Sequence, residues 1–249
     1  MRPAHWFLSY DLYERHQVVA RLIAAHGAQD RQVLDVGGRI GLLQRFVPCR
    51  VISVNVDGSG DVGYAGETLP FASDSFDIVV AIDTLEHIPR AQRPRFVSEC
   101  LRVSRSAIIL AAPFGSPGHA EAEARLNDLF ERLTGKAHRY LSEHILYGLP
   151  DTKEIQDLIM QSGAQSFRLM FAGDYRRESR FFEAAMRSNL ERSLPARLTA
   201  LVWHARSRAL FNRLTLSETP LPYSNRFFLE LLKTCVTSSP AAPASSVAT

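Results

Sequence analysis

The stretch Val33-Leu34-Asp35-Val36-Gly37-Gly38-Arg39-Ile40-Gly41 decides the fold of this 249-residue chain. Its first four residues form a short apolar, β-branched run, which predicts a buried strand. The glycines that follow allow a tight loop in which a backbone can approach a ligand closely. A short helical pattern over 42–46 comes next. We therefore predict a strand, a glycine loop and a helix, in that order.

Strands and helices continue to alternate after this loop. We predict strands over 51–56, 75–82 and 107–112, with a helix over 94–103 before the last of them. Short apolar strands that alternate with helices are typical of a parallel sheet buried on both faces. The sequence therefore predicts an α/β fold with a mainly parallel sheet flanked by helices.

Helices dominate the parts of the chain on either side of this core. We predict them over 10–26, 118–133 and 152–162, whereas His138, Glu143 and His144 are expected to lie in a loop. The first helix is expected to bury Leu12, Val18, Val19, Leu22 and Ile23 and to expose Glu14, Arg15 and Arg21. Strands are also expected over 166–171 and, at the edge of the sheet, over 227–232.

We expect one domain over residues 1–236, followed by a tail. Its core spans 33–113, and a mostly helical region spans 114–224. Residues 237–249 are only Ser, Pro, Ala, Val and Thr, with no charge and no periodicity. Such a segment cannot bury enough apolar surface to fold, so we predict that it is disordered.

The composition excludes several classes of protein. Hydrophobic residues make up 46% of the chain, as in a soluble globular protein, and no stretch approaches the roughly 20 apolar residues that span a bilayer. The net charge of +3 is too small to require a nucleic-acid partner. The three cysteines are widely spaced, which predicts neither disulfides nor a zinc site. With no signal-like N-terminal segment, we expect a cytoplasmic protein.

Two polar residues at the end of the second strand suggest the kind of ligand. Asn55 and Asp57 follow Asp35 by 20 and 22 residues. A side chain at this distance can accept hydrogen bonds from a ribose diol at the carboxyl edge of the sheet. The spacing thus favours a ligand that contains adenosine, without deciding which one.

Three further motifs carry a resemblance to a known family. They are Leu69-Pro70-Phe71, the strand Phe76-Asp77-Ile78-Val79, and the turn Leu85-Glu86-His87-Ile88, and Glu99-Cys-Leu-Arg102-Val103 follows them. In this order they resemble the class I S-adenosylmethionine-dependent methyltransferases, over about residues 33–113. The resemblance implies a Rossmann-like fold, S-adenosylmethionine as cofactor, and a helical acceptor-side extension.

The resemblance also implies roles for individual residues. The segment around Asp35, Gly37, Gly38, Arg39 and Gly41 would cradle the methionine part of the cofactor. Asn55 or Asp57 would hold the ribose, Thr68 and Leu69 would line the adenine, and Asp83 would lie beside the methionine and the sulfonium.

The sequence departs from the family at three positions. Arg39 stands where glycine is frequent, Asn55 replaces the usual ribose-binding acid, and Ala65 stands where an acidic residue often reads the adenine amine. These departures keep open a second reading, a binding or scaffold protein that kept the fold and lost turnover. A third reading, a nicotinamide-dependent oxidoreductase, fits less well because the loop lacks the dinucleotide fingerprint.

The acceptor side offers two candidate catalytic histidines. His87 follows the strand 75–82 and could act as a base, although a histidine that only caps this turn is the favoured reading. His144 is the second candidate for the acceptor site. Glu143 and His144 are adjacent, which is the wrong spacing for two ligands on one helix face, so no metal site is predicted.

By resemblance, the acceptor is a small molecule, a sugar or a lipid-linked precursor. DNA methyltransferases of this fold usually carry an Asn/Asp-Pro-Pro-aromatic motif after the fourth strand, and Asp83-Thr-Leu-Glu86 differs from it. Nucleic acid is therefore not the expected partner.

The positive charge of the chain is concentrated in one segment. Nine Arg and three Glu lie between Arg176 and Arg213. Within it, 197–214 has an apolar face that includes Leu198, Leu201 and Val202. Such a helix can contact an anionic membrane, but ordinary packing against the protein is the favoured interpretation.

Overall fold

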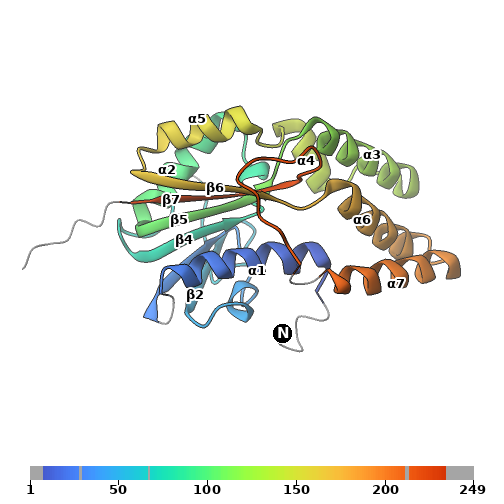
Figure 1. Cartoon of the computed structure of the whole chain (residues 1–249), viewed down its shortest axis with the longest axis horizontal. Helices are drawn as coiled ribbons and strands as arrows, with labels where there is room; N and C mark the ends of the chain where they lie inside the picture. The colour runs from blue at the N-terminus through green and yellow to red at the C-terminus, as the bar shows by residue number, and fades with distance from the viewer. Residues whose placement is uncertain (1–7, 28–29, 67, 211–212, 234–249) are drawn as a thin grey trace, which may run out of the picture.

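A seven-stranded sheet forms the centre of the molecule, in the order β3-β2-β1-β4-β5-β7-β6 (Figure 1). The computed structural model describes residues 8–27, 30–66, 68–210 and 213–233. The strands are β1 (Gln32–Val36), β2 (Arg50–Asn55), β3 (Val62–Gly63), β4 (Phe76–Ile82), β5 (Ser104–Pro113), β6 (Ser166–Ala172) and β7 (Arg226–Leu232). Of the seven strands, β7 alone runs in the opposite direction, antiparallel to β5 and β6. The predicted α/β fold with a mainly parallel sheet is confirmed.

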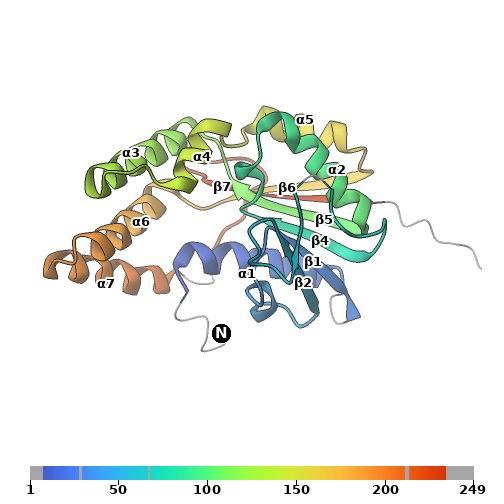
Figure 2. The ribbon, with the colours of Figure 1, turned by 180° about the vertical axis from the view of Figure 1, so that it is seen from behind.

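Helices cover both faces of the sheet, as Figures 1 and 2 show. On one face lies α1 (Tyr10–Ala25), and on the other lie α2 (Arg93–Val103) and α5 (Thr152–Ser162). Alternate residues of β4 supply the two cores: Ile78 and Val80 pack with α1, whereas Val79 and Ala81 pack with α2 and α5. Successive residues of β4 face opposite sides of the sheet, and helices cover both sides. Positions 78–82 of the strand are therefore all apolar.

Four helices extend beyond one end of the sheet. They are α3 (Pro117–Thr134), α4 (Arg139–Tyr147), α6 (Tyr175–Leu190) and α7 (Leu194–Ala209) (Figure 2). The expectation of a loop around His138 and His144 is wrong, because α4 forms there. His138 begins this helix, and its side chain accepts a hydrogen bond from the Leu141 amide. A histidine cap is an uncommon start signal, which explains why the sequence did not indicate it.

The predicted helix over 42–46 is reduced to one 3-10 turn, η3 (Leu43–Arg45). Pro48 disfavours helical backbone at the residue before it. The Gln44 amide then donates to the carbonyls of Val47 and Cys49, at 3.3 and 2.8 Å. These bonds turn the chain directly into β2.

The last strand does not lie at the edge of the sheet. Instead, β7 is inserted between β5 and β6. Phe227, Phe228, Leu229 and Leu231 are all fully buried, so this strand needs cover on both sides. The first three residues of β6 are exposed, which suits an edge.

In two helices, α1 and α7, the residues that are buried differ from the prediction. Glu14 of α1 is buried and accepts a hydrogen bond from the Tyr10 hydroxyl at 2.7 Å, because α6 and α7 cover that side of the helix. In α7, Leu198, Leu201 and Val202 are 54%, 63% and 51% exposed. This helix packs on α6 with another face, so the favoured packing of its apolar face is wrong.

Two further expectations concern membrane-spanning helices and the tail of the chain. Within the described residues, no helix is long and apolar enough to cross a membrane. The predicted disordered tail, 237–249, lies outside the described residues.

Candidate active site

A cavity of about 820 Å³ opens at the carboxyl ends of β1 and β4. These two strands are neighbours, and the strand order reverses between them. In open α/β sheets, ligands bind at such a switch point. The cavity extends from the glycine loop after β1 to residues of α3, α4 and α6. We call its two parts the glycine-loop end and the histidine end.

The glycine loop is fixed by hydrogen bonds from its own neighbours. The Asn55 side-chain amide donates to the carbonyl oxygens of Gly37 and Gly38, at 2.9 and 3.3 Å. Gly37 has a φ of +80°, and a Cβ there would collide with the Thr84 side chain. Only glycine therefore fits at this position.

Asp35 lies directly beneath the loop. It is 2% exposed, and a Cβ on Gly38 would collide with its carboxylate. Burial raises the pKa of Asp35 to about 7. Its Oδ1 has no hydrogen-bond partner among the described residues. A buried polar atom of this kind is ready to bind a polar ligand group.

The Leu-Pro-Phe segment is held by the Glu-x-x-Arg motif of α2. Glu99 accepts a hydrogen bond from the Leu69 amide at 3.1 Å. Arg102 donates to the carbonyls of Phe71 and Leu69, at 2.8 and 3.0 Å, and pairs with Glu99. The two motifs therefore form one structural unit that positions the buried Leu69 at the cavity.

Asp83 is tied into a network of charges between the two ends of the cavity. Its φ of +50° turns the chain sharply after β4. Its carboxylate pairs with Arg15 of α1 and Arg226 of β7, and both arginines also pair with Asp11, at 2.7 and 3.0 Å. Burial alone would raise the pKa of Asp83, but the two guanidinium groups outweigh it and lower the pKa to about 2.

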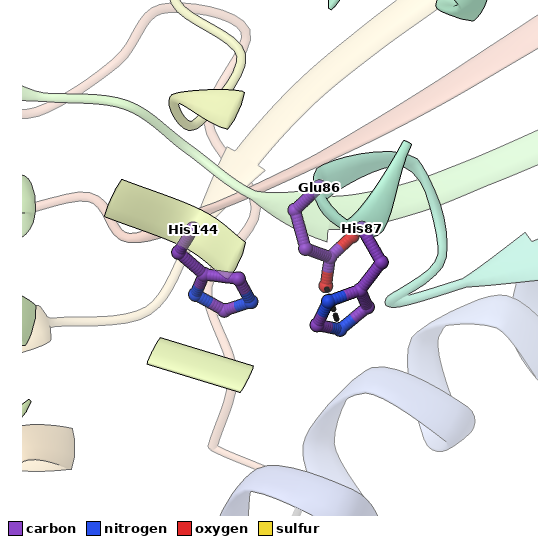
Figure 3. A group of neighbouring side chains, drawn as sticks. All are labelled: Glu86, His87 and His144. Carbon is purple, nitrogen blue, oxygen red and sulfur yellow. Dashed lines mark ion pairs between the residues drawn. The ribbon is translucent and has the colours of Figure 1, made fainter. Parts of the chain in front are cut away.

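The histidine end gathers Glu86, His87 and His144 (Figure 3). Glu86 and His87 come from the 3-10 turn η4 (Leu85–His87), and His144 comes from α4, which packs against it. Burial, with the charge of Asp83, raises the pKa of Glu86 to about 8. Burial and the charge of His144 lower the pKa of His87.

A carboxylate lies beside the Nδ1 of each histidine, and the carboxylate of Glu123 is hydrogen-bonded to His144. The His144 Nδ1 is 3.0 Å from Glu123 Oε2, and the His87 Nδ1 is 2.8 Å from Glu143 Oε2. Burial would lower the pKa of His144, but the hydrogen bond and the charge of Glu123 outweigh it and raise the pKa. The two rings lie with their centroids 4.9 Å apart.

Most residues predicted for the site line this one cavity. Those that do are Asp35, Gly37, Gly38, Arg39, Asn55, Asp57, Leu69, Asp83, His87 and His144. Gly41 and Thr68 do not line it. Asp57 is exposed, and its Oδ1 accepts a hydrogen bond from the Ser59 amide at 2.9 Å.

The sequence did not indicate Arg15, Glu86 or Arg226 as site residues. Arg15 was expected on the solvent face of its helix, and Arg226 begins a strand without any local motif. Glu86 belongs to the Leu-Glu-His turn, but nothing in the sequence indicates that its carboxyl is buried beside His144.

Comparisons with known proteins identify a matching family model and similar folds. Residues 34–111 match the family model described as a methyltransferase domain. No match was found among curated proteins. Phosphoethanolamine N-methyltransferase 2 of Haemonchus contortus has a similar structure, with a TM-score of 0.53 and 16% identity, over 87% of this chain and 52% of that one. This chain thus spans about half the length of that enzyme.

Two further structures are similar over most of their length. A proposed sarcosine dimethylglycine methyltransferase from Galdieria sulphuraria has a TM-score of 0.54 and 16% identity, over 89% of this chain and 86% of that one. A SAM-dependent methyltransferase from Archaeoglobus fulgidus has a TM-score of 0.51 and 13% identity, over 89% and 94%. Residues 34–111 thus match a methyltransferase domain model, and the chain has the fold of the class I S-adenosylmethionine-dependent methyltransferases.

Proposed function

We propose that the chain transfers the methyl group of S-adenosylmethionine to a small-molecule acceptor. The single observation that carries this proposal is the continuity of the cavity from the glycine loop, past Asp83, to the histidine end. Its volume of about 820 Å³ lies in the upper part of the range, about 300–1,000 Å³, that is usual for small-ligand sites. That volume leaves room for a donor and an acceptor side by side.

The donor is assigned to the glycine-loop end. The methionine part would lie over Asp35 and Gly38, where the buried carboxyl can meet the α-ammonium group. Both loop carbonyls already accept from the Asn55 amide, so the Asn55 Oδ1 is left to accept from a ribose hydroxyl. Asp57 lies two residues further along the chain as a second acceptor for the ribose diol. Leu69 offers the apolar surface for the adenine.

Asp83 is assigned a positioning role. Two guanidinium groups neutralise its carboxylate, so the charge of Asp83 adds little to the field that the sulfonium would feel. The same pairs fix α1 and β7 against the end of β4. Asp83 therefore holds the wall of the cavity between donor and acceptor in place.

The acceptor is assigned to the histidine end. Methyl transfer is an in-line displacement from a cationic sulfur, so positioning and the exclusion of water supply much of the acceleration. A base is needed only for a hydroxyl or protonated amine. The lowered pKa of His87 keeps its imidazole neutral at neutral pH, as a base requires.

The charge of the cavity favours a small acceptor over nucleic acid. At the histidine end and around it, the carboxylates of Asp11, Asp83, Glu123 and Glu143 face the cations of Arg15, Arg139 and Arg226. Burial raises the pKa of Glu86 to about 8 and that of Glu178 well above its ordinary value, so these two carboxyls are neutral at neutral pH. The positive and negative charges are therefore nearly balanced, and this end lacks the strongly basic surface that a phosphate backbone requires. Amines, hydroxyl compounds, sugars and lipid-linked precursors all remain acceptors to be tested.

The test is a transfer assay with S-adenosylmethionine labelled in its methyl group. The purified chain is incubated with separate pools of amine, hydroxyl, sugar and lipid-linked compounds, and label in the product is counted. We expect transfer to one pool and none with Gly38→Val, whose side chain would displace Asp35. Binding of S-adenosylmethionine without transfer to any pool would instead favour the scaffold reading that Arg39, Asn55 and Ala65 left open.

A further inference from the structure

Three metal-ligating side chains converge at the histidine end, and methyl transfer as such does not require them together. One ligand atom each from Glu86, His87 and His144 can be chosen so that all lie within 4.8 Å of one another. All three side chains line the cavity. Figure 3 shows that they approach from two elements, η4 and α4, and face one another.

All three side chains carry a buried polar atom without a hydrogen-bond partner among the described residues, and in His87 this atom is Nδ1, which forms only an ion pair with Glu143. Glu86 is 1% exposed, and its Oε2 has no hydrogen-bond partner among the described residues. The His144 side chain is 10% exposed, and its Nε2 has none either. Buried polar atoms are nearly always hydrogen-bonded, so two such atoms at one place require an explanation. An ion bound between them would supply it.

The Nδ1 of each histidine lies beside a carboxylate, and at His144 the two groups are hydrogen-bonded. The Nδ1 of His144 faces Glu123 at 3.0 Å, and the Nδ1 of His87 faces Glu143 at 2.8 Å. A histidine that ligates a metal usually donates its other ring N–H to a carboxylate, which fixes the ring and makes the ligating nitrogen more basic. Both Nε2 atoms are thereby left for an ion, and that of His87 is 3.9 Å from Glu86 Oε1.

We propose that Glu86, His87 and His144 bind one divalent transition-metal ion, for which Zn²⁺ is the natural probe. Two imidazoles and one carboxylate are a ligand set that holds zinc with a fourth position open. Imidazole nitrogen also favours zinc over magnesium or calcium, which prefer oxygen ligands. Tetrahedral bonds of about 2.0–2.1 Å place ligand atoms roughly 3.3 Å apart. Small side-chain rotations close the present spacing to that value.

The open position would face the cavity and take an oxygen atom of the acceptor. This consequence rests on the proposed methyl transfer. A bound cation lowers the pKa of a hydroxyl as it does that of water. With its Nε2 on the ion, His87 would act as a ligand and not as the base considered above. The hydroxyl proton would therefore leave to solvent, the C–O bond would form as the C–S bond breaks, and S-adenosylhomocysteine would depart. The ion thus favours a hydroxyl acceptor within the small-molecule class.

Metal binding is tested without any turnover. The full chain is stripped with EDTA, dialysed and titrated calorimetrically with ZnCl₂, and Co²⁺ is then added to read the coordination by visible absorption. We expect one Zn²⁺ per chain and the intense Co²⁺ absorption of a four-coordinate site. His87→Ala and His144→Ala should each weaken Zn²⁺ binding by more than about 100-fold. Glu123→Gln, which changes the carboxylate behind His144 but none of the three ligands, should weaken it by about 10- to 100-fold.

His138→Asn is the matched control, because it removes a cavity-lining imidazole and keeps a side chain that can begin α4. Its Zn²⁺ affinity should stay within about twofold of the wild type. Absence of stoichiometric Zn²⁺ binding, or equal affinity in His144→Ala, would overturn the proposal. A weak six-coordinate Co²⁺ spectrum would overturn it as well, and because it is measured on the wild type it does not depend on variants that fold.

A parallel titration with S-adenosylhomocysteine separates this proposal from the one on which its consequence rests. Binding of S-adenosylhomocysteine without Zn²⁺ would remove only the metal site. Binding of Zn²⁺ without S-adenosylhomocysteine would remove the proposed methyl transfer and leave the metal site standing.

Discussion

The two ends of the cavity are built in different ways. The glycine-loop end comes from consecutive parts of the chain, β1 with its loop, the end of β2 and the Leu-Pro-Phe segment. The histidine end is assembled from η4, α3 and α4, with α1 and β7 behind it. A glycine loop shapes the first end, whereas Glu86, Glu123, Glu143 and two histidines gather at the second. A site made by a local loop can be read from sequence, and a site made by packing cannot.

The largest effect is expected from a substitution that disrupts only the glycine-loop end. In Gly38→Ala the new Cβ would collide with the Asp35 carboxylate. We expect the Kd for S-adenosylhomocysteine to rise on the order of 100-fold, the size of effect that a misplacement of about 1 Å can have. Calorimetry measures it. Gly63→Ala is the matched control, because a Cβ there meets nothing within 4 Å, and an equal loss in both variants would contradict the assignment.

Asp83→Asn tests the network between the two ends. Asparagine tolerates the positive φ, so the change removes mainly the charge that pairs with Arg15 and the buried Arg226. We expect a loss of about 3 kcal/mol in the free energy of unfolding at pH 7. Because the folded pKa of about 2 lies below the ordinary 3.8, this stabilisation is present above pH 4 and disappears as the pH falls towards 2. The free energies of unfolding of the wild type and Asp83→Asn, measured in urea from pH 7 to pH 2, should therefore converge as the pH falls.

Asp35→Asn should raise the free energy of unfolding at high pH, whereas Asp83→Asn lowers it. The folded pKa of Asp35, about 7, lies above its ordinary value of 3.8, so its contribution to stability is full below pH 4 and is lost as the pH rises through 7. The variant should therefore be more stable than the wild type at pH 8, by about 2 kcal/mol, while binding S-adenosylhomocysteine less tightly. A variant that is less stable at pH 8 would show that Asp35 is not a strained buried acid.

The smallest effect is expected in the helices beyond the sheet. Leu198 of α7 is 54% exposed, so Leu198→Ala should change the free energy of unfolding by less than about 0.5 kcal/mol. Leu158→Ala in α5, a change of the same atoms in a core helix, should cost about 2–5 kcal/mol. Thermal or urea unfolding compares the two. A large loss from Leu198→Ala would restore the packed interpretation of α7.

These contrasts show what could be predicted from the sequence. The bounds of α5 match the predicted 152–162, because Asp151 begins the helix, Gly163 follows it, and its apolar residues have a clear period. Within 33–113, β1, β2, β4, α2 and β5 were predicted for the same kind of local reason, whereas the two-residue strand β3 was not. The placement of β7 was wrong, because its apolar run predicts burial but not which neighbours cover it.

In the candidate site, too, only some residues could be predicted from the sequence to lie together. Asp35, Gly37, Gly38 and Asn55 lie beside one another because β1 and β2 are adjacent parallel strands whose carboxyl ends meet. His87 and His144 were each predicted as acceptor-site candidates, but 57 positions separate them in the sequence. Only the packing of α4 on η4 shows that they face the same carboxyl, Glu86. No pattern along the chain contains that information.

The most direct test of the central claim is calorimetric titration of the purified chain with S-adenosylhomocysteine and, separately, with NADH. The claim is that the glycine-loop end binds the sulfur cofactor. We predict one S-adenosylhomocysteine bound per chain, no heat from NADH, and loss of the S-adenosylhomocysteine signal in Gly38→Ala but not in Gly63→Ala. Binding of NADH, or of neither ligand, would contradict the claim and reduce the methyltransferase assignment to a statement about fold.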